Sequence, residues 1–275
     1  MTETLMLPRQ CALYAGVELR RLWLTRSGLM TLAATAVIWG LLFRYAIVPA
    51  ADLVSSRGFV NMISGLFGDA GLNQLSAWPA PELAVYWFFS LLLLPMFSIF
   101  FTANQLCTDL ERGTLRFLTL RSSRLSLVLG RFSGQMLVQA CLISLTLGAT
   151  VLLAAWQRDG LTLAMLNAAA VIVVNLLIVI LPFTALMAVF SALVRSPKLA
   201  VSLATVVLGL SFGLLSWFVF YFPDFLFLLG YLPGTQVVHL LTLTGWDALS
   251  YAGLPLVQAA LFLALATLIM TRRAI

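Results

Sequence analysis

Few residues of this 275-residue chain have the side chains and spacing that enzyme chemistry needs. Gly209, Ser211 and Gly213 form a GxSxG pattern, which in α/β hydrolases places a nucleophilic serine on a sharp strand-to-helix turn. Here the pattern lies inside a continuous apolar segment that predicts a helix, and the only candidate base is His239, the single histidine. An intramembrane serine hydrolase using Ser211 and His239 is one hypothesis. Close helix packing through Gly209 and Gly213 is the simpler interpretation.

The same scarcity of functional groups excludes other chemistries. One histidine cannot form a two-histidine metal site, and the three cysteines, Cys11, Cys107 and Cys141, form no CxxC pair, so no metal site is predicted. The only lysine, Lys198, follows Pro197, which excludes a phosphate-binding GxxxxGK[ST] loop. We therefore expect no catalytic residue and no cofactor in this chain.

The composition indicates what surrounds these residues. Apolar residues make up 62% of the chain and charged residues 9%, with a mean hydropathy of +1.04. A soluble domain is roughly half apolar and one quarter charged. Six apolar runs, none alternating like barrel strands, are long enough to cross about 30 Å of hydrocarbon as helices: Leu29–Val48, Leu83–Leu106, Phe132–Trp156, Leu161–Val194, Leu199–Phe222 and Tyr251–Thr271. The sequence predicts an all-α polytopic membrane protein with one transmembrane domain, residues 1–275.

The distribution of charge predicts how the chain is oriented in the bilayer. Thirteen of the sixteen Lys and Arg residues lie in the N-terminal segment, the loops after spans two and four, and the C-terminus. Arg44, Arg57 and Arg158 lie on the other side. Because cytoplasmic loops carry the excess of basic residues, both termini are predicted to be cytoplasmic. The net charge of +6 is thus explained by topology, and no nucleic-acid partner is expected.

Residues 10–27, before the first span, predict an amphipathic helix in the cytoplasmic membrane interface. Tyr14, Glu18, Arg21 and Thr25 recur at steps of four, three and four, which places them on one polar stripe of a helix. A plain cytoplasmic extension of the first span is the alternative.

The segment before the last span is predicted to re-enter the membrane from the outer side. Pro223–Asp224 and Pro233–Gly234 divide it, so each apolar piece within Phe225–Leu243 is too short to cross the bilayer. We expect this hairpin to pack on its own bundle, because backbone at membrane depth must be buried in protein or face a cavity. A pair of helices on the outer surface is the alternative.

Uncharged amides are the main polar groups inside the spans. Gln135 and Gln139 lie in the third span, and Asn167 and Asn175 in the fourth. Hydrogen bonds between helices are the direct interpretation, and lining a substrate path is the alternative. An ion-coupled transporter is disfavoured, because such a protein normally needs a charge buried in the membrane.

The loop between spans two and three is the most distinctive segment. Gly113 is expected to end the extension of span two, and Ser122 or Ser123 to cap the next helix. Between them lies a short predicted helix whose apolar side chains are ringed by arginines: Leu115, Phe117, Leu118 and Leu120, with Arg112, Arg116, Arg121 and Arg124. Apolar side chains facing the cytoplasm predict a docked protein partner, with the charges fixing its orientation. Packing on lipid headgroups is the alternative.

This loop resembles that of the permease subunits of ABC-2 type ABC transporters. The family pattern is roughly E-x-G-T-L-E-x-L-L-x-x-P-x-S-R, then L-G-K, and the matching residues here are Glu111, Gly113, Thr114, Leu115, Leu118, Ser123, Arg124 and Leu129-Gly130-Arg131. Arg116 and Arg121 stand where the family often has Glu and Pro. The resemblance extends to Pro95 in span two, the six spans, the interfacial helix and the broken hairpin. The long first external loop is closest to the branch with gliding-motility and copper-maturation permeases.

The resemblance implies a membrane-spanning permease of a bacterial inner-membrane exporter that is not itself an enzyme. ATP and Mg²⁺ would bind a separate ABC ATPase subunit, and a second permease copy would complete a homodimer. The residues implied in ATPase coupling are Glu111, Gly113, Thr114, Leu115, Arg116, Phe117, Leu118, Arg121 and Arg124. A non-transporting membrane assembly factor whose loop docks another protein is a further hypothesis.

Overall fold

The computed structural model describes residues 2–49, 78–114, 117–118, 123–158, 160–241 and 245–272. These residues form helices and turns, in the order α1 (Thr2–Leu24), α2 (Arg26–Leu42), the π-helical turn η1 (Phe43–Ile47), α6 (Pro81–Thr102), α7 (Cys107–Glu111), α9 (Arg124–Gln157), α10 (Leu163–Leu193), α11 (Pro197–Tyr221), the 3₁₀ helix η2 (Pro223–Tyr231), α12 (Gln236–Leu241), the 3₁₀ helix η3 (Gly245–Ala252) and α13 (Gly253–Arg272).

Six helical segments of the described chain are long and apolar enough to cross a membrane: Gly28–Ile47, Pro81–Glu111, Arg124–Gln157, Leu163–Leu193, Pro197–Tyr221 and Gly245–Arg272. The prediction of an all-α protein with six spans is therefore confirmed. The long fourth span is one helix that continues through Pro182. A proline is tolerated there because neighbouring helices can satisfy the backbone groups that it frees.

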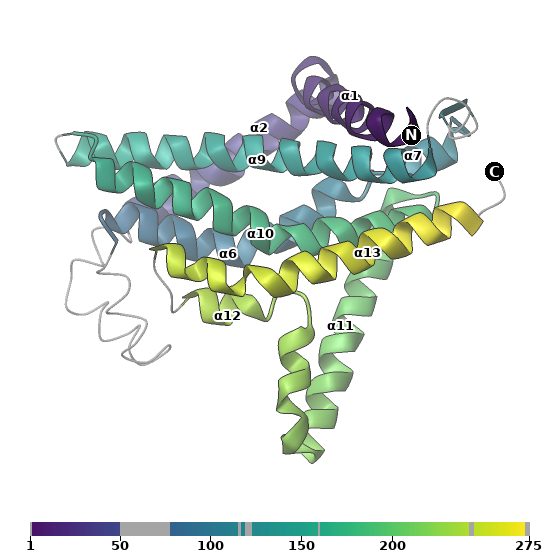
Figure 1. The fold of residues 1–275 in the computed structure, drawn as a ribbon. Helices are drawn as coiled ribbons and strands as arrows, with labels where there is room; N and C mark the ends of the chain where they lie inside the picture. The colour runs from purple at the N-terminus through teal and green to yellow at the C-terminus, as the bar shows by residue number, and fades with distance from the viewer. Residues whose placement is uncertain are drawn as a thin grey trace.

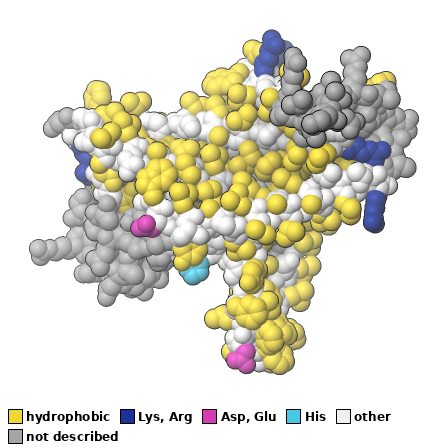
Figure 2. All heavy atoms as spheres, in the orientation of Figure 1, with side chains coloured by type: hydrophobic (Ala, Val, Ile, Leu, Met, Phe, Trp, Pro, Cys, Tyr) yellow, Lys and Arg dark blue, Asp and Glu magenta, His cyan; other side chains and the backbone are white. Residues whose placement is uncertain are grey.

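Helices α6, α9, α10 and α13 lie side by side as a bundle in Figure 1, and α10 contacts the other three. The side chains of Ile172, Leu176 and Ile180 on α10 are fully buried, so this helix forms the centre of the bundle. The start of α1, the end of α13 and α7 lie at the same end of the bundle (Figure 1), as an even number of spans requires. Hydrophobic side chains cover much of the visible surface (Figure 2), as expected of a surface that faces lipid.

Helices α1 and α2 meet at a tight turn. The Thr25 hydroxyl accepts a hydrogen bond from the Gly28 N–H at 3.1 Å and donates one to the Arg21 carbonyl at 2.7 Å. A Cβ atom on Gly28 would lie 2.3 Å from the carbonyl oxygen of Leu22, so a side chain does not fit there. The predicted interfacial helix at 10–27 therefore ends at Leu24 in the structure, and the first span follows directly.

Helix α11 leaves the bundle at a steep angle, and η2 returns beside it (Figure 1). We call α11 and η2 together the arm. Its only buried residues are Ala200, Ala204 and Val219, all on α11, and η2 buries none. The rings of Phe218 and Phe225 lie 5.5 Å apart and hold η2 against α11.

The predicted breaks in the hairpin are present in the structure. Pro223 begins η2, and Gly234, with φ of 97°, turns the chain toward α12. Leu240 of α12 is buried in the main core of the bundle. The expectation that the hairpin packs on its own bundle is thus met by α12. It is wrong for most of η2, which packs on α11, although the Tyr231 carbonyl at the end of η2 accepts from Gln258 Nε2 of α13 at 2.7 Å.

Candidate functional site: the loop between the second and third spans

The loop begins where α7 ends. The Arg112 N–H donates to the Thr108 carbonyl at 3.0 Å, and Gly113 follows in the left-handed region with φ of 68°. Glycine adopts this conformation without the steric cost that other residues meet, so it commonly ends a helix. The Thr114 hydroxyl then donates to the backbone carbonyl and to Oδ1 of Asp109, both at 3.3 Å. The sequence thus turns sharply at Gly113, and Thr114 holds that turn against α7.

The loop ends at the first turn of α9, which is capped as the sequence predicts. The Ser123 hydroxyl accepts from the Ser126 N–H at 3.1 Å. Arg124, expected in the charged ring, points to the end of α13, where Nη1 donates to the carbonyls of Met270 at 2.5 Å and Thr271 at 2.8 Å. A cation at the last carbonyls of a helix is favourable, so Arg124 ties the end of the loop to the last span.

Between these two ends, Phe117 and Leu118 face in different directions. The Phe117 side chain is 74% exposed, whereas Leu118 packs against a core cluster that includes Leu127 and Met270. Phe117 is therefore an apolar side chain presented outward. The remaining loop residues named from the sequence, Leu115, Arg116 and Arg121, lie outside the described residues. Glu111 is exposed near the start of the loop.

A buried ion triad lies directly behind the loop. The guanidinium of Arg131 on α9 donates through Nη1 to Oε1 of Glu18 on α1, and through Nη2 to Oδ2 of Asp109 on α7 at 2.5 Å. The Arg131 and Asp109 side chains are 15% exposed and that of Glu18 is 7% exposed. Arginine suits this position because its planar fork can bind two carboxylates at once. We call Glu18, Arg131 and Asp109 the ion triad.

The triad depends on a close approach of α1 to α9. A Cβ atom on Gly130 would lie 2.8 Å from Cβ of Tyr14, and one on Gly134 would lie 2.9 Å from Cβ of Glu18. The spacing of these glycines is GxxxG, which lets helices approach closely. As a result, Tyr14 and Glu18 of the polar stripe face α9 while Arg21 stays exposed, and Glu18 is buried instead of facing the cytoplasm.

Sequence reasoning missed the triad and this glycine pair. Glu18 was placed on the polar stripe of a helix at the membrane interface, and Arg131 was named only as part of the family pattern. The available signal was the arginine within Gly130-Arg-Phe-Ser-Gly134, just before the third apolar run. A cation beside a close-packing motif calls for an acidic partner on the helix that packs there.

The amides inside the spans serve two different purposes. Gln139 Nε2 donates to the Thr184 hydroxyl at 3.0 Å, which joins α9 to α10, and Asn167 Oδ1 accepts from Trp246 Nε1 at 3.2 Å. Asn175 Nδ2 instead donates to the Val171 carbonyl of its own helix. Gln135 is partly buried on α9, one turn from Gln139.

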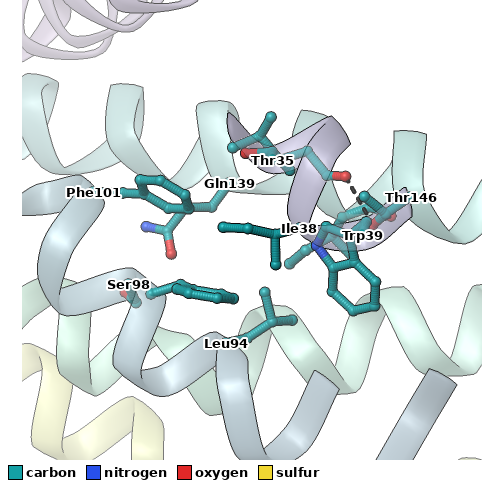
Figure 3. Close-up of a pocket in the computed structure, with 11 residues that line it drawn as sticks. Thr35, Ile38, Trp39, Leu94, Ser98, Phe101, Gln139 and Thr146 are labelled. Carbon is teal, nitrogen blue, oxygen red and sulfur yellow. Dashed lines mark hydrogen bonds between the residues drawn. The ribbon is translucent and has the colours of Figure 1, made fainter. Parts of the chain in front are cut away.

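Gln139 also lines a small cavity between α2, α6 and α9. Figure 3 shows Thr35 and Trp39 of α2, and Ser98 and Phe101 of α6, arranged around it. Its volume is about 20 Å³, which is room for about one water molecule. This size does not hold a transported molecule, so a path-lining role for Gln135, Gln139, Asn167 or Asn175 stays a prediction.

Among the described residues, Ser211 of the GxSxG pattern and its candidate base His239 make separate contacts. The Ser211 hydroxyl donates to the Val207 carbonyl of its own helix at 2.7 Å, and the His239 ring stacks on Tyr251 at 5.3 Å. No described atom lies within 4 Å of a Cβ atom built on Gly209 or Gly213, apart from the neighbouring residues and the helix backbone. Close packing of a helix against these two glycines stays a prediction.

Comparison with known proteins agrees with this architecture. The family model described as "ABC-2 family transporter protein" matches residues 17–270, which include α1 from Val17 onward, the loop, the first five candidate spans and the sixth as far as Met270. The chain belongs to this ABC-2 transporter family. No match was found among curated proteins.

Membership of the ABC-2 family assigns the chain a general role. It is a multi-pass membrane subunit of a transporter, and members of this family generally work with an ABC ATPase subunit. The matched region contains the ion triad and the described part of the loop, so both belong to the domain that the family shares. The branch with gliding-motility and copper-maturation permeases stays a prediction.

Proposed function

We propose that this chain is the permease of a split ABC-2 exporter, and that a separate ABC ATPase docks on the loop between α7 and α9. The observation that carries the proposal is Phe117, an apolar side chain 74% exposed on a loop whose two ends are tied to the bundle. An exposed aromatic side chain on a loop anchored at both ends fits a hydrophobic groove on a partner, since the buried cores of interfaces are enriched in aromatic residues, phenylalanine included. ATP and Mg²⁺ bind the ATPase in this arrangement.

The loop has the mechanical properties that a coupling element needs. Leu118 packs on the core and Arg124 holds the end of α13, so a force on Phe117 reaches the spans directly. Closure of two ATPases would then rock the helices of two permease copies against each other. The family's general use of an ABC ATPase supports this arrangement, and the charge-poor spans favour export of an amphipathic substrate. The basic loops favour cytoplasmic termini in a bacterial inner membrane.

Co-purification tests the proposed docking. The chain and its ABC ATPase are co-expressed, the permease is tagged, and the ATPase is quantified after solubilisation. Phe117→Asp should abolish co-purification because it places a charge in an apolar groove. The matched control is Trp156→Asp, the same kind of change at an aromatic that is 88% exposed at the far end of α9. If Phe117→Asp retains the ATPase as well as Trp156→Asp does, Phe117 is not the anchor. If the unmodified chain retains no ATPase, the proposed function fails.

A further inference from the structure

The ion triad joins the loop to α1, which otherwise lies on the outside of the bundle. We propose that Glu18, Arg131 and Asp109 are positioning residues that pass a movement of the ATPase-docking loop to α1. This inference rests on the proposed function, because the loop moves only if an ATPase pulls on it. It assigns α1 to the moving part of the transporter, whereas the sequence alone indicates only an amphipathic helix in the membrane interface.

The contacts form an unbroken chain from the loop to α1. Thr114, the first described residue after the turn at Gly113, donates to Asp109. Asp109 accepts from Nη2 of Arg131, whose Nη1 donates to Glu18. Each step is a polar contact with a specific direction, and two of the three involve opposite full charges, which make stronger and shorter hydrogen bonds than neutral groups.

The link is stiff because breaking either ion pair would leave a charge without its partner in a mostly buried place. Removing one member of a buried ion pair is strongly unfavourable, because it leaves the other charge buried without compensation. The glycines at 130 and 134 add to the stiffness, since they hold α1 within van der Waals distance of α9. A displacement of α7 is therefore passed on to α1 with little slack.

Attachment of α1 alone does not require these charges. Leu22 of α1 already packs with Val138 and Leu142 of α9 in an apolar cluster about one turn beyond the triad. Apolar packing of this kind would hold α1 at the surface of the bundle. What the triad adds is a connection between α1 and α7, which leads into the loop. The outward face of α1 carries exposed apolar side chains, including Leu13 and Val17, so its movement takes place against lipid.

Cys11 on α1 provides a native reporter for the test. Its partly buried thiol donates to the Ser126 carbonyl on α9, so its accessibility reports whether α1 is docked. The chain, with Cys107→Ser and Cys141→Ser, is co-purified with its ABC ATPase in phospholipid nanodiscs. Maleimide labelling of Cys11 is followed by peptide mass spectrometry, without nucleotide and with ATP, Mg²⁺ and vanadate.

The parent complex should show different labelling rates in the two nucleotide states. Asp109→Asn should lose this difference while the ATPase still co-purifies, and so should Glu18→Gln. Because the contacts act in series, the double variant Glu18→Gln/Asp109→Asn should show no greater loss of the difference in labelling rate than either single variant. Asp247→Asn, the same chemical change at an exposed aspartate of η3, is the matched control and should keep the full difference.

Two results would overturn the link. One is a Cys11 labelling rate in the parent complex that is equal in the two nucleotide states. The other is a difference in labelling rate in Asp109→Asn that is as large as that of the parent complex. If Asp109→Asn does not assemble, Thr114→Val takes its place, since it leaves all three charges and removes the hydroxyl contact. In Thr114→Val, the difference in Cys11 labelling rate between the two nucleotide states should shrink. A difference as large as that of the parent complex would overturn the link. Failure of the proposed function is recognised separately, as absence of the ATPase from the parent preparation before any labelling.

Discussion

Two GxxxG pairs in this chain have the same spacing and opposite surroundings. On α9, Gly130 and Gly134 lie against Tyr14 and Glu18 of α1, with no room for even a methyl group. On α11, Gly209 and Gly213 face open space within the described chain. The spacing thus permits close approach without requiring it. A helix packs closely on such a pair only where it supplies a complementary side chain. On α9 that side chain is the carboxylate of Glu18, which pairs with Arg131 between the two glycines.

The largest effect should come from removing the charge between the glycines of α9. Arg131→Met keeps much of the side-chain volume but leaves two carboxylates largely buried without a cation, which we expect to cost about 3–5 kcal/mol. Thermal unfolding in detergent measures the loss. Arg112→Met, at an exposed position of the loop, should change stability by less than about 0.5 kcal/mol. Equal melting temperatures for the two variants would show that the triad contributes nothing to folding.

A smaller loss should follow from filling the space between α1 and α9. Gly134→Leu places its Cβ atom 2.9 Å from Cβ and Cγ of Glu18 and 3.3 Å from the backbone Cα of Ala15, so α1 must shift. Overpacking of this kind costs about 1–3 kcal/mol. Labelling of Cys11 should be faster in the same variant, because α1 moves away from α9 and exposes the thiol. A stable Gly134→Leu protein with slow Cys11 labelling would mean that α1 and α9 do not lie this close.

The pH dependence of labelling should separate docked from released α1. Burial raises the pKa of the Cys11 thiol above its ordinary value, because the thiolate is the charged form and is the more poorly solvated. The reactive thiolate therefore appears at higher pH in the docked protein than in an exposed cysteine. The pH at which the labelling rate levels off should fall in Gly134→Leu. The same profile in both proteins would contradict docking of α1 through Gly134.

The smallest effect should come from the other glycine pair. Gly213→Leu meets no described neighbour, and the stability of the isolated chain should change by less than about 0.5 kcal/mol. If the arm packs on a second copy of the chain, the same change should weaken the dimer, which light scattering of the detergent-solubilised protein detects. A loss of chain stability as large as that of Gly134→Leu would show that the arm packs on its own chain.

Local chemistry predicted much of the fold and the ends of the candidate site. Apolar runs of membrane length gave the six spans, because lipid demands such runs of any helix that crosses it. Gly113 and Ser123 were identified as a helix end and a helix cap because their partners lie within a few residues. Pro223 and Gly234 were identified as breaks for the same reason.

What could not be predicted depends on partners far along the chain. Glu18 and Arg131 are separated by 113 positions, and Arg124 meets Met270 across 146. An amphipathic pattern gives the polar side of α1 but not whether that side faces water or another helix. Only the packing against α9 shows that Glu18 is buried. The direction of the arm was missed for a similar reason, since aromatic contacts between α11 and η2 carry it away from the bundle.

The 113 positions between Glu18 and Arg131 also set an order of events during synthesis. Ribosomes add about 5–20 residues per second, so Arg131 emerges roughly 6 to 23 seconds after Glu18. During that interval the first span is already made, and the carboxylate of α1 stays at the membrane surface, where water can solvate it. Docking of α1 through the triad must wait until Arg131, near the start of α9, has been made. The N-terminal helix, although made first, is therefore not the first to reach its final place.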